Sequence, residues 1–198
     1  MFRYSISVLF LILLAVIFQQ FLPAFIGLYN SRVFLLLIVF LCVAVTVPLP
    51  VMFLYALICG FLWDAQCALS GDKLDMGIYQ VSASSLRFGM SILLFGLTGA
   101  LMHGFQQLFL QGKWYLSAIL TGIATFVYLI AEYGLLDFTR GAVTINRGVM
   151  LQISYTSLFS VIVSPAIFGM LFLLARLWHH SLVETKRPRN HFGLMNSR

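Results

Sequence analysis

The sequence contains long segments that are apolar on every face of a helix, and these segments restrict its fold more than any other feature. Val33–Val47 is one example, and Gly148–Ala175 includes no charged side chain. Only 9% of the 198 residues are charged and 61% are apolar, whereas about 25% of the residues of a soluble domain are charged. This composition excludes a soluble enzyme, and an aromatic content of 15% excludes a disordered chain. We expect lipid to surround most of the chain.

The apolar segments predict a helical membrane protein. A helix needs about 20 mainly apolar residues to cross about 30 Å of hydrocarbon, and a β-barrel would instead show short segments of alternating polarity. We therefore expect an all-α polytopic bundle of six transmembrane helices, which forms a single domain over residues 1–178. The expected spans are residues 6–25, 33–47, 51–63, 88–109, 114–136 and 151–177. The first segment lacks the small residues of a signal-peptide cleavage site, so we interpret it as a retained helix.

Two prolines divide the segment Val33–Trp63. As one helix, its 31 residues would be about 46 Å long, which exceeds the bilayer thickness. Pro48 and Pro50 would also interrupt the hydrogen bonds of such a helix near its middle. We therefore predict two short helices, the second and third spans, joined in a tight proline hairpin. Pro165 is expected to bend the sixth span midway.

A basic cytoplasmic tail, residues 179–198, is expected after the last span. The cations expected to lie at the lipid surface are Arg176, Lys186, Arg187 and Arg189. We favour anionic lipid over nucleic acid as the partner of this tail, because a membrane helix precedes it. Six spans put both termini on one side, and the tail places that side in the cytoplasm. The cations of the shorter loops favour the opposite orientation.

The expected fourth span carries small residues on one face. Gly96, Ala100 and Gly104 are spaced by four residues, and Gly99 lies beside them. Such a face lets a neighbouring helix approach closely, and van der Waals contact then drives helix association in lipid. The neighbouring helix belongs either to this chain, which we favour, or to a partner protein. A homo-oligomer is also compatible with this pattern.

Four ionisable residues are expected at membrane depth, namely Asp64, Arg87, His103 and Glu132. In antiparallel fourth and fifth spans, residues whose numbers sum to about 225 lie side by side, which separates His103 from Glu132 by about 15 Å. These two residues therefore form no catalytic pair. The other three fall near the outer ends of their spans, and we hypothesise a charge cluster in which Arg87 offsets one or both carboxylates. The cluster is either a structural ion pair or a site for a partner or ligand.

The sequence holds no motif typical of catalysis. It contains no GxSxG elbow, no HExxH pair and no Gly-rich phosphate loop. We therefore expect no enzyme activity, no cofactor and no metal site. Gln19 and Gln20, near the outer end of the first span, are expected to hydrogen-bond to neighbouring helices or lipid headgroups.

Several segments occur in an order that matches a known family in kind. They are Phe18–Pro23, the proline hairpin, Gly60–Asp64, Phe88–Gly89 before Ser91–Gly104, and Ser164–Phe168 before Leu173–Arg176. Together they resemble the MreD family of bacterial rod shape-determining membrane proteins, over roughly Ile6–His180. In that family, Ser-Gly and then a Leu-Gly that opens the next helix follow the aspartate closely. Here about fifteen extra residues separate Ser70–Gly71 from Phe88–Gly89, so the outer loop is enlarged.

The resemblance implies a non-catalytic scaffold in the bacterial inner membrane. Such a scaffold helps determine rod cell shape by organising lateral peptidoglycan synthesis with MreB, an MreC-like protein, RodA and a transpeptidase. The alternative is a vitamin-binding membrane subunit of an energy-coupling-factor transporter, because MreD-like proteins are similar in fold to these subunits. That alternative requires a small ligand and a partner that carries an ATPase.

Overall fold

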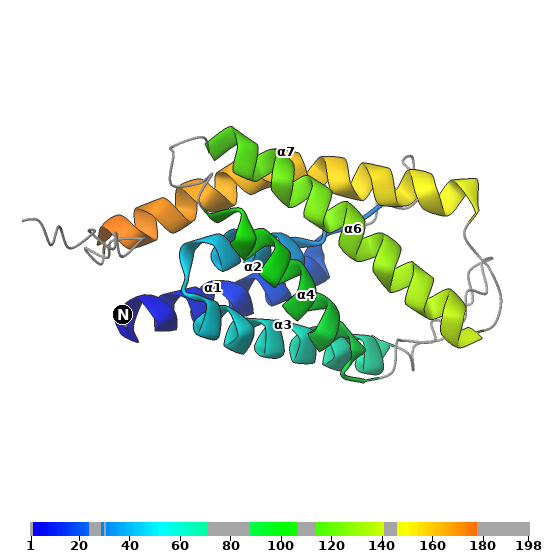
Figure 1. Cartoon of the computed structure of the whole chain (residues 1–198), viewed down its shortest axis with the longest axis horizontal. Coiled ribbons are helices and arrows are strands. Elements are labelled where there is room, and N and C mark those ends of the chain that lie inside the picture. The colour runs from blue at the N-terminus through cyan, green and yellow to red at the C-terminus, as the bar shows by residue number, and fades with distance from the viewer. Residues whose placement is uncertain are drawn as a thin grey trace, which may run out of the picture.

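The computed structural model is a bundle of helices (Figure 1). It describes residues 2–23, 29, 31–70, 88–106, 114–140 and 146–177. The helices within these ranges are α1 (Phe2–Phe21), α2 (Leu35–Thr46), α3 (Leu49–Ser70), α4 (Met90–Gly104), α6 (Trp114–Arg140) and α7 (Arg147–Leu177). The predicted all-α fold is therefore confirmed.

Four of these helices are long and apolar enough to cross a membrane. The candidate spans are Tyr4–Phe21, Leu49–Ala68, Tyr115–Thr139 and Arg147–Leu174. At 12 and 15 residues, α2 and α4 are only about 18 and 22 Å long, which is less than the hydrocarbon thickness of about 30 Å. Each of the six predicted spans thus corresponds to a helix in the described ranges, and four of these helices have the length of a membrane span.

The short helix α2 lies at the centre of the bundle. Every residue from Leu36 to Thr46 is buried, and α2 contacts α1, α3, α4, α6 and α7. Other helices of the chain therefore cover this segment, although its sequence is apolar on every face. A helix that is apolar all round fits either lipid or a protein core, and tertiary packing decides between them.

The proline hairpin between the second and third spans is confirmed. Only Val47 and Pro48 separate α2 from α3, and the Met52 N–H donates to the Pro48 carbonyl oxygen at 3.0 Å. Pro50 lies in the first turn of α3, where its missing N–H removes no helical hydrogen bond.

The predicted third span, residues 51–63, is too short. The helix α3 continues through Asp64 to Ser70, for 22 residues in all. Asp64 therefore lies within α3 and not at the start of a loop. Its side chain is buried and accepts a hydrogen bond from the Gly89 N–H, just before α4. The helices α1, α6 and α7 begin or end four residues from their predicted limits, and α7 contains Pro165 without interruption.

The exposed surface of the helices is apolar and their inward faces carry hydroxyl groups. In α6 the exposed residues include Tyr115, Ile119, Ile123 and Val127, while Ser117, Thr121 and Thr125 are buried. The Thr121 and Thr125 hydroxyls donate at 2.8 Å to carbonyls one turn earlier, so their burial leaves no unmet donor. A soluble amphipathic helix has the reverse polarity, so this pattern is typical of a helix that faces lipid.

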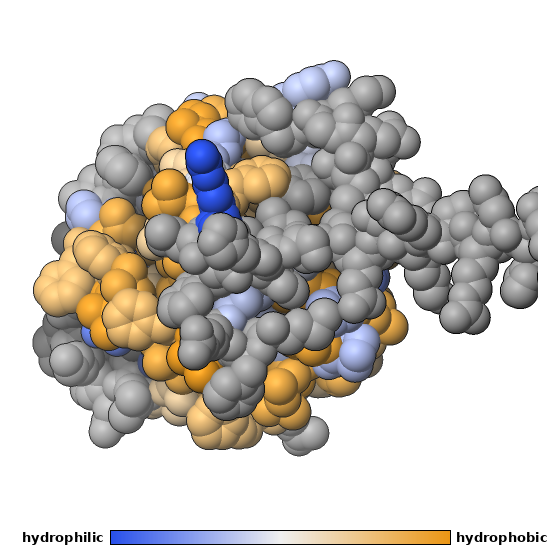
Figure 2. Space-filling view, turned by 90° about the vertical axis from the view of Figure 1, so that its left-hand side faces the viewer, coloured by the Kyte–Doolittle hydropathy of each residue, from blue (hydrophilic) through white to orange (hydrophobic). Residues whose placement is uncertain are grey.

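Both ends of the described chain lie at one end of the bundle. In Figure 1, α1 begins and α7 ends at the left, while α3 ends and α4 begins at the right. Figure 2 looks onto the left end, where the described residues at the rim are mainly apolar.

Candidate functional site

The buried carboxylate of Asp64 connects α3 to the beginning of α4. One of its oxygens accepts the Gly89 N–H at 2.6 Å, and Asp64 is 6% exposed. Gly89 precedes the first residue of α4 with a φ of 99°, a conformation that glycine adopts without the strain of other residues. A carboxylate at this position satisfies a free helical N–H and interacts favourably with the positive end of the α4 dipole.

The carboxylate of Glu132 lies against the same end of α3. Its Oε1 accepts the indole N–H of Trp63 at 3.4 Å, and Trp63 immediately precedes Asp64 in the chain. Glu132 is therefore close enough to Asp64 for the two carboxylates to repel each other. Two of the three residues of the hypothesised charge cluster thus come together, whereas Arg87 lies outside the described residues. Its role as the balancing cation stays a prediction.

Two buried hydroxyl groups lie beside these carboxylates. Tyr128 is one turn before Glu132 on α6, and Ser91 is in the first turn of α4. Both are fully buried, at 0% and 1% exposure, and neither hydroxyl makes a hydrogen bond within the described residues. The Tyr128 hydroxyl interacts with both carboxylates and lies near the Ser91 hydroxyl.

We call Asp64, Ser91, Tyr128 and Glu132 the carboxylate–hydroxyl cluster. Sequence reasoning found its two acids and missed its two hydroxyl groups. Tyr128 could have been found, because residues four apart share a helix face and Glu132 was already a candidate. Ser91 carries no such signal, since only the packing of α4 between α3 and α6 brings it to the acids.

Aromatic rings pack against the inner side of the cluster. The Phe34 ring lies 4.3 Å from that of Trp63 and 5.7 Å from that of Tyr128, centroid to centroid. The Phe95 ring lies 5.3 Å from that of Tyr128. The Phe34 and Phe95 rings are both buried, so the cluster adjoins the apolar core on this side.

His103 lies at the opposite end of the bundle from this cluster. Its Nδ1 is 3.1 Å from the carbonyl oxygen of Ala44, near the end of α2, and a carbonyl can only accept. Trp63, the partner of Glu132, packs instead against Phe34 before the start of α2. The prediction that His103 and Glu132 form no pair agrees with these separate contacts.

The small residues predicted on α4 differ in their surroundings. A Cβ on Gly99 would meet the Met52 sulfur and the Phe40 ring at 2.7 Å, so Gly99 allows close packing within the chain. Gly96 meets only the Phe53 ring, at 3.9 Å, and nothing lies within 4 Å of such an atom on Gly104. Ala100 is partly buried against the core.

Two other glycines, which the sequence reasoning missed, lie at close contacts between helices. A Cβ on Gly60 would meet the Ile92 backbone, and one on Gly122 would meet the Val161 side chain. The Gly122 carbonyl also accepts the Ser157 hydroxyl at 2.7 Å, which ties α6 to α7.

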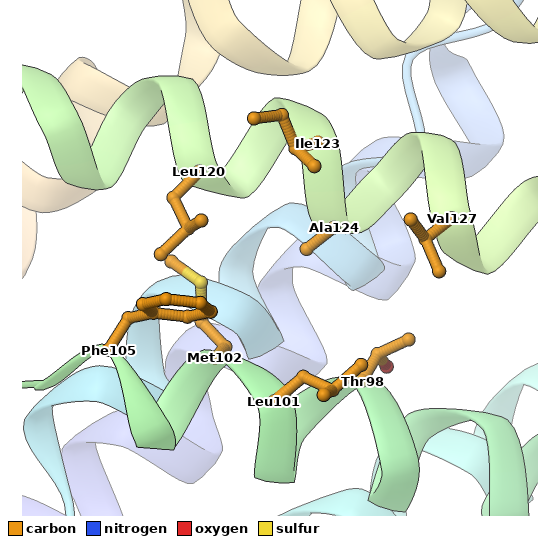
Figure 3. Close-up of a pocket in the computed structure, with 8 residues that line it drawn as sticks. All are labelled: Thr98, Leu101, Met102, Phe105, Leu120, Ile123, Ala124 and Val127. Carbon is orange, nitrogen blue, oxygen red and sulfur yellow. The ribbon is translucent and has the colours of Figure 1, made fainter.

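An apolar groove runs between α4 and α6. Its cavity has a volume of about 100 Å³. The lining residues are Thr98, Leu101 and Met102 on α4, Phe105 directly after it, and Leu120, Ile123, Ala124 and Val127 on α6 (Figure 3).

The groove confirms the expected register of these two antiparallel helices. Phe105 lies beside Leu120, and Thr98 lies beside Val127, so each pair of numbers sums to 225 (Figure 3). The Thr98 hydroxyl donates to the Leu94 carbonyl at 2.7 Å, so the groove presents apolar groups. Leu101 and Ile123 are exposed, which opens the groove onto the outer surface.

The other predicted positions are only partly described. Gln19 accepts the Leu36 N–H at 2.9 Å, which confirms that this glutamine bonds to a neighbouring helix and shows that it caps the start of α2. Arg176 is exposed at the end of α7. Lys186, Arg187 and Arg189 lie outside the described residues.

Comparisons with protein-family models, with curated proteins and with solved structures found no match. Within the described ranges, no three His, Cys, Asp or Glu side chains form a group that could hold a metal ion. The helices, the cluster and the groove therefore define a helical protein with four candidate membrane spans.

Proposed function

We propose that this protein is a six-pass scaffold of the bacterial inner membrane that acts in the manner of the MreD family. It organises lateral peptidoglycan synthesis, and hence rod shape, together with MreB, an MreC-like protein, RodA and a transpeptidase. The segments quoted for the MreD resemblance support this assignment. The position of both described ends at one end of the bundle is compatible with six passes (Figure 1).

The outer face of α4 with the α4–α6 groove is the observation that carries the scaffold function. Leu93, Leu97 and Leu101 are exposed by 69%, 61% and 52% along α4. The groove beside them is apolar and opens outward, and the exposed Gly104 follows Leu101 by three residues along α4. A transmembrane helix of the MreC-like partner packs here by van der Waals contact, which is the interaction that holds helices together in lipid.

A leucine at Gly104 tests this docking surface without disturbing the bundle. No atom of the described chain lies within 4 Å of a Cβ at this position, so we expect the Gly104→Leu variant to fold. We expect its recovery of the MreC-like protein from detergent extracts to fall by about tenfold, which corresponds to about 1.4 kcal/mol of binding free energy.

Gly169→Leu is the matched control. Gly169 is exposed on α7, and a Cβ at this position would likewise have no described atom within 4 Å. Its recovery of the partner should equal that of the wild type. Equal recovery by both variants would exclude this end of the α4 face as the docking surface.

Depletion in cells tests the function itself. Rods should become round, and newly inserted lateral wall should lose its ordered distribution. The Gly104→Leu protein should restore rod shape less well than Gly169→Leu at equal expression. Rods that keep their shape and insertion pattern after depletion would refute the scaffold function.

The two unpartnered hydroxyls of the carboxylate–hydroxyl cluster favour a second function, that of a vitamin-binding transporter subunit. Buried groups without partners are typical of a site that a ligand completes. This function requires a small molecule retained through purification and co-purification with an ATPase-bearing module. Recovery of the MreC-like protein without either would favour the scaffold.

The orientation follows from the basic tail. We place both termini in the cytoplasm, since the tail cations lie next to the last membrane helix. Labelling of single cysteines placed near each terminus by an impermeant reagent should occur only after the membrane is opened. Labelling of the two ends from opposite sides would exclude an even number of passes.

A further inference from the structure

The two acids of the carboxylate–hydroxyl cluster receive only neutral hydrogen-bond donors in the contacts that the structure gives them. Asp64 accepts a backbone N–H and Glu132 accepts an indole N–H. Neither donor carries the positive charge that would offset two neighbouring acids. Placing a carboxylate in a medium of low dielectric constant costs several kcal/mol unless a positive charge compensates it.

The two hydroxyl groups of the cluster point to the same missing component. The Tyr128 and Ser91 hydroxyls are fully buried, and neither has a hydrogen-bond partner within the described residues. An unsatisfied buried hydroxyl costs about 1–3 kcal/mol, so such groups usually have a partner that completes the site. Tyr128 also lies in the neighbourhood of both acids, one turn before Glu132 on α6.

We propose that the carboxylate–hydroxyl cluster binds a hard metal cation. A cation offsets the negative charges and accepts lone pairs from the hydroxyl oxygens, so it satisfies all four side chains at once. A water molecule would satisfy the hydroxyls and leave the acids uncompensated. The proposal does not depend on the scaffold function, because none of the four cluster residues lines the α4–α6 groove.

The oxygen ligands that the cluster offers determine which class of metal ion it would bind. The cluster offers two carboxylates and two hydroxyl oxygens, which are the ligands that Na⁺, Mg²⁺ and Ca²⁺ prefer. A divalent ion would balance both carboxylates. The Cys67 thiol, one turn after Asp64, also lies near both acids, but hard cations do not favour sulfur.

The position of the cluster gives such an ion a route of entry. It lies where α3 ends and α4 begins, at one end of the bundle, and the rings of Phe34 and Phe95 close its inner side. A cation that enters from this end of the bundle would not have to cross the apolar core around α2. Bound there, it links α3, α4 and α6.

Carbodiimide labelling of Glu132 measures occupancy of the site. The full chain is purified in detergent with chelator and treated with a hydrophobic carbodiimide, and adducts are mapped by mass spectrometry. NaCl, MgCl₂, CaCl₂ and choline chloride are compared at equal ionic strength, so that screening is the same in every sample. We expect one of the metal salts to slow labelling about tenfold relative to choline chloride at ten times its dissociation constant.

Two variants remove the hydroxyl ligands and keep both acids. Tyr128→Phe and Ser91→Ala each delete one unpartnered hydroxyl, so both should fold and lose most of the metal protection. Ser160→Ala is the control, because Ser160 is equally buried and its hydroxyl already donates to Thr156. The same metal salt should raise the unfolding temperature of the wild type and of this control, but not of Tyr128→Phe.

Three results would overturn the proposal. The first is equal labelling of the wild type in all four salts. The second is metal protection that survives in both Tyr128→Phe and Ser91→Ala. The third is protection that appears only in Arg87→Gln, because Arg87 itself would then supply the compensating charge.

Discussion

Replacing Gly60 by alanine tests how closely α3 and α4 approach each other. A Cβ at Gly60 would lie 2.5 Å from the Ile92 Cα and 2.7 Å from the Ile92 nitrogen. Both atoms belong to the backbone of α4, so no side-chain rotation can relieve the contact. The two helices must therefore move apart for alanine to fit.

The size of this movement gives the expected loss of stability. Ordinary van der Waals contact begins at 3.4 Å, so the Ile92 Cα must move by about 0.9 Å. Overpacking of this kind costs about 1–3 kcal/mol. The movement also stretches the 2.6 Å hydrogen bond between Asp64, one turn after Gly60, and the Gly89 N–H. The higher helix propensity of alanine offsets part of this loss, because glycine is less favourable than alanine within a helix by about 1 kcal/mol.

Gly134→Ala separates these two contributions. Gly134 lies within α6, and nothing lies within 4 Å of a Cβ at this position, so its alanine variant gains helix propensity alone. We expect Gly60→Ala to be less stable than Gly134→Ala by about 1–3 kcal/mol, because both gain helix propensity and only Gly60→Ala forces the two helices apart. The measurement is unfolding by SDS in mixed micelles, followed by tryptophan fluorescence. If Gly60→Ala proved as stable as Gly134→Ala, the close approach of the two backbones would be refuted.

Three further substitutions test individual hydrogen bonds by the same unfolding measurement. Gln19→Leu should lower stability by about 1 kcal/mol, because it removes the side chain that caps α2, and an unchanged midpoint would contradict that role. Ser157→Ala should cost about 0.6 kcal/mol through loss of a bond between α6 and α7, whereas Ser154→Ala, whose hydroxyl bonds within its own helix, should cost less. Trp63→Phe should cost about 1–3 kcal/mol by leaving the Glu132 carboxylate without its indole donor. In a Glu132→Gln background this cost should shrink, and equal costs in both backgrounds would show that the indole and the carboxylate are not coupled.

The periodicity of the sequence predicts the helices but not their surroundings. Val33–Val47 is apolar all round, which identifies a helix away from water. Lipid and packed side chains are both apolar, so the same pattern fits a helix in contact with either. Only the tertiary structure places α2 among five other helices and leaves the exposed apolar surface to its neighbours.

The two acids of the candidate site could be predicted from the sequence, but the arrangement of the site in space could not. An acid at membrane depth is costly, so Asp64 and Glu132 are recognisable as special from the sequence. The extension of α3 past Asp64 and the approach of Ser91 depend on contacts between segments distant in the chain.

The sequence by itself determined that the chain forms apolar helices with a proline hairpin between two of them, because these properties follow from residue type and local backbone geometry. The tertiary structure decided which small residues allow close packing. The sequence indicated Gly96, Gly99, Ala100 and Gly104, and of these three glycines only Gly99 makes a close contact. The other close contacts occur at Gly60 and Gly122. The physical reason is that a missing side chain matters only where another helix passes close by, and the path of that helix is set by the packing of the whole bundle.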